Sequence, residues 1–119
     1  MNVIIGVIVV FIILEHALFF ILESFLWTHK KTRKIFGLKS LEFAEETKVL
    51  AANQGVYNSF LSAGLLISFI DSNSYYISIF LIFVTIAGII GSLTTKKKTI
   101  FLVQSIPAII ALVLIFLTK

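Results

Sequence analysis

Glu15 and His16 stand next to each other in a run of residues that is otherwise almost wholly aliphatic and aromatic, and Glu23 follows in the same run. Ionisable side chains are costly inside a bilayer and usually face other helices or a water-filled cavity. A structural role needs only one polar residue, so two adjacent titratable residues are more than it requires. Such a pair could also share a proton. The pattern therefore favours a functional site for proton exchange, cation binding or acid–base chemistry.

A second group of polar side chains lies in a later apolar run, and one amide interrupts the last run. Amides can orient a polar ligand, but inside membranes they also bond one helix to another, worth about 0.6–2 kcal/mol each. Both interpretations stay open. Glu45 and Lys48, three residues apart, are expected to form an interfacial ion pair. The candidate ligand-binding residues are Glu15, His16, Glu23, Glu46, Asn53, Gln54, Tyr57, Asn58 and Gln104.

The composition predicts a membrane protein. Of the 119 residues, 59% are hydrophobic and 13% are charged, against roughly 25% charged in an average soluble domain. The mean hydropathy is +1.08. A soluble domain this small has too little interior to bury so many apolar side chains. We therefore expect a single membrane domain over residues 1–119, with the lipid bilayer as its solvent.

Four segments are candidates for membrane-spanning helices, at about residues 3–28, 41–70, 75–94 and 100–118. About 20 apolar residues suffice to cross ~30 Å of hydrocarbon. The second segment is the most polar, and Ser40 is a suitable N-cap for it. No segment alternates apolar and polar residues as a barrel strand does. The predicted fold is an all-α bundle of four transmembrane helices.

The basic residues fall in the first and third connectors between these segments and are absent from the second. Cytoplasmic connectors carry an excess of lysine and arginine, so both basic connectors are expected in the cytoplasm and both chain termini outside. Orientation thus explains the net charge of +4 without a nucleic-acid partner. The cations concerned are Lys30, Lys31, Arg33, Lys34, Lys39, Lys96, Lys97 and Lys98.

A rise of ~1.5 Å per residue sorts the membrane-embedded polar groups into two layers. Glu15, His16 and Asn58 are expected near mid-membrane. Glu23, Asn53, Gln54 and Gln104 are expected in a second layer nearer the cytoplasm. Residues seven apart share a helix face, as His16 and Glu23 do, and as Glu46 and Asn53 do. The two faces are consistent with a polar interior that opens to the cytoplasm.

Four blocks of the chain resemble a known family. They are Leu14-Glu15-His16 with Glu23 and Phe25-Leu26-Trp27-Thr28; the stretch from Phe43 to Asn58 with its Asn53-Gln54-Gly55-Val56-Tyr57-Asn58 run; Ala87-Gly88-Ile89-Ile90-Gly91; and Val103-Gln104-Ser105-Ile106-Pro107-Ala108. Together they are similar to the bacterial membrane family called domain of unknown function 1304. The resemblance implies four helices and a multi-pass protein of the bacterial inner (cell) membrane. It implies no established activity.

Three functions follow as expectations. The first is a small transporter or binding protein for a small polar or cationic ligand or a proton, favoured as a homo-oligomer because four short helices enclose little space. The second is an intramembrane acid–base enzyme acting on a lipid-like substrate. The third is a non-catalytic partner subunit. The chain has no cysteine, two histidines and no phosphate-loop or metal-ligand motif, so no cofactor and no metal are expected.

Overall fold

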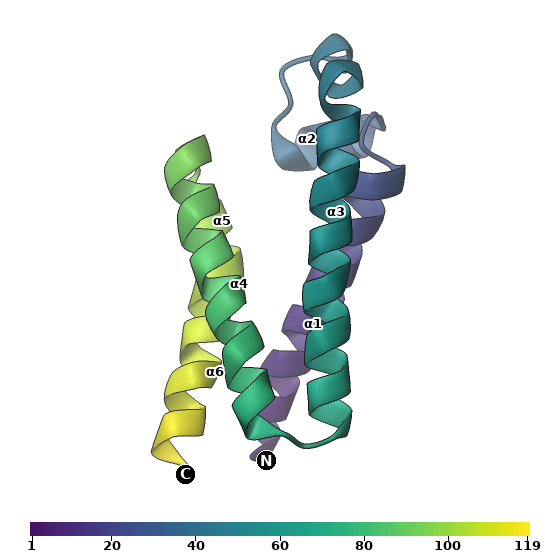
Figure 1. The fold of residues 1–119 in the computed structure, drawn as a ribbon. Helices are drawn as coiled ribbons and strands as arrows, with labels where there is room; N and C mark the ends of the chain where they lie inside the picture. The colour runs from purple at the N-terminus through teal and green to yellow at the C-terminus, as the bar shows by residue number, and fades with distance from the viewer. The chain divides into compact units, whose positions relative to one another are not determined.

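The computed structural model describes all residues, 1–119, and confirms the all-α prediction, because every regular element is a helix. In chain order these are α1 (Val3–Phe25), α2 (Lys30–Phe36), α3 (Leu41–Ile70), α4 (Ser74–Thr95), α5 (Lys98–Ile100), the π-helical turn η1 (Phe101–Ser105) and α6 (Ile106–Leu117) (Figure 1). The bounds of α3 match the expected 41–70. The first connector contains a short helix, α2, that the four expected segments did not include.

Three stretches are long and apolar enough to cross a membrane: Val3–Phe25, Ser74–Thr95 and Lys98–Leu117. The 30-residue α3 is not among them. Its polar residues, such as Glu45, Lys48 and Asn53, dilute its apolar character. The structure thus has three helices of membrane-spanning length and composition beside one long helix of mixed polarity.

The ends of the helices have local causes. The Oγ atom of Ser40 accepts a hydrogen bond from the backbone N–H of Phe43 at 3.0 Å, which confirms Ser40 as the N-cap of α3. Asn73 caps α4 in the same way, accepting from the N–H of Tyr76 at 3.2 Å. Gly37 ends α2 with φ = 64°, a left-handed conformation that glycine adopts without steric cost.

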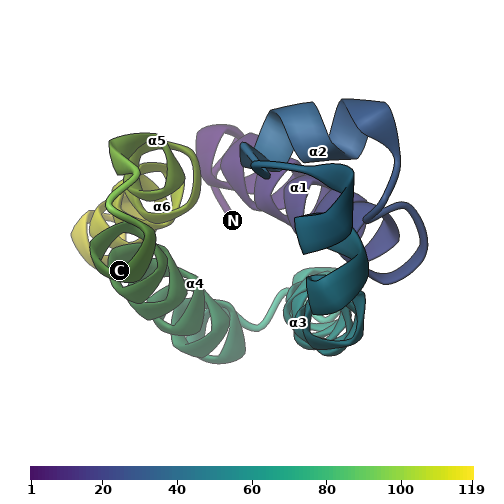
Figure 2. The same cartoon turned by 90° about the horizontal axis from the view of Figure 1, so that it is seen from above.

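Internal contacts divide the chain into two compact units, and each is described by itself. The first unit comprises Met1–Leu14 and Leu61–Lys119. Within it, α4 packs along η1 and α6, as both views of the ribbon show (Figures 1 and 2). Its core is purely aliphatic and consists of Ile5, Val9, Ile12, Ile13, Leu65, Ile77, Leu81, Val84, Ala108, Ala111 and Ile115. The second unit, Glu15–Phe60, contains the candidate site.

The π-helical turn η1 directly precedes α6, whose second residue is Pro107. A proline lacks the N–H that would bond the carbonyl four residues earlier, and its ring clashes with that carbonyl. Here the affected carbonyl belongs to Val103, inside η1. A wider turn relieves that clash, so Pro107 accounts for the position of the irregular turn.

α4 and η1 approach each other closely at Gly88. A Cβ atom at this position would lie 3.0 Å from the backbone nitrogen of Ser105 and 3.0 Å from Cβ of Gln104, and it would collide with Oγ of Ser105. That hydroxyl also donates to the backbone carbonyl of Thr85 at 2.9 Å. The absent side chain of Gly88 is therefore what lets the two backbones meet, as small residues do between membrane helices.

We expect Gly88→Val to destabilise the protein by about 1–3 kcal/mol, because the added atoms overpack a contact that has no room for them. The matched control is Ala87→Val, which adds methyl groups on an exposed face of the same helix turn. The measurement is the midpoint of thermal unfolding in lipid discs. Equal midpoints for the two variants would contradict the close packing of α4 on η1.

Candidate functional site

The second unit is built on a close approach between the last part of α1 and the first part of α3. A Cβ atom at Gly55 would lie 3.1 Å from the backbone oxygen of Phe20 and would collide with Oγ of Ser24. The Ser24 hydroxyl donates to the backbone carbonyl of Ala52 at 3.0 Å. Small residues on both helices thus bring the two backbones together and set their mutual register.

The short helix α2 is anchored to this pair by aromatic side chains. The ring of Phe36 packs against the rings of Phe19 and Trp27, with centroids 6.3 and 5.1 Å apart. The indole Nε1 of Trp27 donates to Oγ1 of Thr47 on α3 at 3.0 Å. Trp27 therefore connects the end of α1 to both α2 and α3.

Glu23 forms the buried polar contact between the two helices. Its side chain is 7% exposed, and its Oε1 atom accepts a hydrogen bond from Nδ2 of Asn58. The contacts Ser24 to Ala52 and Glu23 to Asn58 show that α1 and α3 run antiparallel. Burying a carboxyl group without a hydrogen-bond partner is unfavourable, so the Asn58 amide stabilises Glu23 at this position.

The pairing corrects the expected layers. Asn58 was expected with Glu15 and His16 near mid-membrane, but it contacts Glu23. The expectation compared only the heights of the backbone. Side chains on a helix lean toward its N-terminus, so on antiparallel helices Glu23 and Asn58 lean toward each other. The backbones of Glu23 and Asn58 lie at different depths, but the inclination of the two side chains brings their polar ends together.

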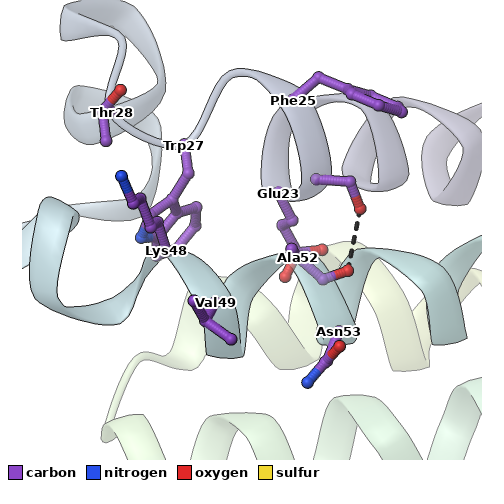
Figure 3. A pocket seen from close by; sticks show the side chains of 9 residues that line it. Glu23, Phe25, Trp27, Thr28, Lys48, Val49, Ala52 and Asn53 are labelled. Atoms are coloured by element: carbon purple, nitrogen blue, oxygen red, sulfur yellow. Dashed lines mark hydrogen bonds between the residues drawn. The ribbon is translucent and has the colours of Figure 1, made fainter.

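A pocket of about 330 Å³ opens beside Glu23. Figure 3 shows its lining side chains, which come from the end of α1, the following turn and one side of α3. Its volume lies at the lower end of the roughly 300–1,000 Å³ typical of small-molecule sites. The lining residues are Glu23, Ser24, Phe25, Trp27, Thr28, Lys48, Val49, Ala52 and Asn53.

The chemistry of the lining is mixed. A carboxylate and an indole ring are both groups that attract cations, and Glu23 and Trp27 supply them here. Lys48 lies at the same pocket, and its Nζ contacts the carboxylate of Glu45 at 3.1 Å. That contact confirms the ion pair expected from the sequence. Because Glu45 offsets the charge of Lys48, Glu23 is the acidic group of this pocket without a basic partner.

Glu15 and His16 are buried but do not pair with each other. Glu15 is 8% exposed, and neither of its carboxylate oxygens has a hydrogen-bond partner. His16 is fully buried, and its ring packs edge to face on Phe19 with centroids 5.6 Å apart. Neighbouring residues on a helix point about 100° apart, so adjacency in sequence does not create a bonded pair.

The remaining candidates do not converge on the pocket, with one exception. Asn53 is exposed on α3 and lines the pocket. Glu46, Gln54 and Tyr57 are exposed on α3 without lining it. Gln104 is half-buried in η1, in the first unit. The sequence thus placed Glu23 and Asn53 in the candidate set but did not single out Ser24 or Thr28, whose small polar side chains carry little signal alone.

We expect Asn58→Leu to destabilise the protein by about 1–3 kcal/mol, because it leaves the buried Glu23 carboxylate without its donor. The double variant Glu23→Leu/Asn58→Leu should recover most of this loss, since it removes both polar partners at once. Chemical unfolding in detergent micelles measures both values. Additive losses in the double variant would show that the two side chains are not coupled.

Residues 10–116 match the family described as protein of unknown function DUF1304. The uncharacterized protein YpaA of Lactococcus lactis subsp. lactis (strain IL1403) is 34% identical over 95 residues, which cover 77% of this chain and 79% of the relative. No solved structure matches the chain. The resemblance seen in the sequence is therefore confirmed, and the chain belongs to the DUF1304 family.

Proposed function

We propose that this chain is a small multi-pass protein of the bacterial inner membrane that binds or carries a small polar or cationic ligand beside Glu23. One observation supports this most directly. A buried carboxylate, held by Asn58, lies in the wall of a pocket that also contains the ring of Trp27. Membrane-embedded carboxylates are costly, and they commonly mark ligand or ion pathways.

The arrangement suits a compact cation. The Asn58 amide fixes one oxygen of Glu23 and leaves the other carboxylate oxygen available to a ligand. Low surrounding polarity strengthens the attraction between the carboxylate and an ammonium group. Trp27 adds a cation–π contact, and Thr28 and Asn53 offer hydrogen bonds for orientation. A proton would compete with a cation for the same oxygens, so proton exchange fits the same site.

The proposal includes four membrane spans with both chain termini outside. The fourth span is α3, whose 30 residues extend about 45 Å at 1.5 Å per residue. That length allows its charged first turns to stay in the interface while the rest crosses the hydrocarbon. The basic residues around α2 and between α4 and α5 then lie on the cytoplasmic side.

A second candidate, a non-catalytic partner subunit, is favoured by the outer face of α3. Asn53, Gln54 and Tyr57 are exposed there, with Tyr57 65% exposed. Polar side chains at membrane depth normally face other helices. A second copy of the chain or a different membrane protein would supply such a helix, and amides bond well across helix contacts.

We expect a small molecule to co-purify with the wild-type protein in native lipid discs and to be lost from Glu23→Gln. The variant keeps the shape of the side chain and removes its charge, so a cation loses its partner. Glu46→Gln is the matched control, because Glu46 is exposed on α3 outside the pocket. Mass spectrometry of the extracted discs identifies the molecule, and thermal unfolding shows whether both variants remain folded.

Two results would decide against the binding site. If Glu23→Gln and Glu46→Gln retain the same molecules as wild type, the pocket holds no ligand that needs the carboxylate. If no small molecule is enriched in any sample while α3 cross-links to another protein through a cysteine at position 57, the partner-subunit candidate takes its place.

We expect Ser72→Cys to react with a membrane-impermeant maleimide on intact cells, and Lys34→Cys to react only after the cells are permeabilised. The chain has no cysteine, so each variant carries a single thiol. The reason is the basic connector around Lys34, which favours the cytoplasm, whereas the turn at Ser72 carries no basic residue. The reverse labelling pattern would overturn the proposed orientation.

A further inference from the structure

The exposed side of α2 combines cations with an apolar side chain. Lys31, Lys34 and Ile35 are all exposed, and residues three and four apart share a helix face. The opposite side is occupied by Thr32, which is 1% exposed, and the half-buried Phe36. Ile35 is 64% exposed although its helix has a buried side available. The short helix therefore presents an exposed isoleucine on the same side as two lysines.

This face is held in place. The contacts of Phe36 with Phe19 and Trp27 fix α2 beside the last turn of α1. Nε of Arg33 donates to the backbone carbonyl of Thr28 at 3.1 Å. Gly37 closes the C-terminal end, with its N–H bonded to the carbonyl of Lys34 at 3.3 Å. These contacts hold the exposed face of α2 in a fixed position close to the end of α1.

No acidic residue offsets these charges locally. Between Glu23 and Glu42 the sequence contains five lysine or arginine residues and neither aspartate nor glutamate. Lys30 and Lys39 are exposed on either side of the central pair. An anionic partner would therefore meet a group of exposed lysines that form no salt bridge.

We propose that the exposed face of α2 binds an anionic phospholipid, with Lys31 and Lys34 on the headgroup phosphate and Ile35 against its glycerol and acyl region. Lysines beside a membrane-spanning helix attract anionic lipids. Their aliphatic stems lie along apolar surface while the ammonium groups reach polar atoms. The exposed Ile35 favours a lipid over free phosphate, because a free anion gives it no apolar contact.

Binding is tested on the full chain in mild detergent by native mass spectrometry, with phosphatidylglycerol and phosphatidylcholine titrated separately. The test variant is Lys31→Gln/Lys34→Gln. The control is Lys96→Gln/Lys98→Gln, which removes the same charge from the other basic connector. We expect the test variant to bind phosphatidylglycerol about ten- to thirtyfold more weakly than wild type, from about a three- to fivefold effect per lysine. The control should lose clearly less binding than the test variant, because Lys96 and Lys98 lie outside the proposed surface.

Two further variants make the outcome decisive. Lys31→Arg/Lys34→Arg should restore binding, which separates loss of charge from loss of folding. Ile35→Ser should weaken phosphatidylglycerol binding and leave any binding of soluble glycerol phosphate unchanged. The proposal is overturned if the two glutamine double variants lose binding equally, if phosphatidylcholine binds as well as phosphatidylglycerol, or if Ile35→Ser has no effect.

Discussion

The close contact between α1 and α3 is the constraint on which the candidate site depends. Gly55 leaves room for the backbone of Phe20 and the side chain of Ser24. Only at that separation can the short side chain of Asn58 reach the carboxylate of Glu23. Without this donor the Glu23 carboxyl group would be buried with an unsatisfied oxygen, as the Glu15 carboxyl group is, at a cost in stability. Backbone proximity, set by Gly55 and Ser24, therefore brings a hydrogen-bond donor to the buried Glu23.

The surroundings of this contact explain why a pocket exists beside it. Trp27 is too large to fit between the two closely packed backbones, and its indole instead bonds Thr47 and packs on Phe36. The ring thus forms a wall at the end of α1, next to Glu23. The same ring anchors α2, so the pocket and the basic surface of α2 share one aromatic support.

The first unit follows a different principle. Its buried contacts are almost entirely aliphatic, and its irregularity is confined to η1. Pro107 creates the need for that turn, and Gly88 and Ser105 provide the space and the hydrogen bond that accommodate it. In membrane helices, polar groups and neighbouring helices commonly compensate for a proline in this way.

The sequence alone determined that the protein is helical, that three of its helical stretches are apolar enough for a bilayer, and that it belongs to its family. These properties follow from composition, from the length of apolar runs and from local caps such as Ser40, which act within a few residues. Even the Glu45–Lys48 pair was predictable, because one helix turn fixes its geometry. The sequence did not predict which polar side chains pair between different helices. Only the tertiary structure pairs Glu23 with Asn58 and leaves Glu15 without a hydrogen-bond partner, because the register and side-chain inclination of two packed helices decide which polar atoms meet.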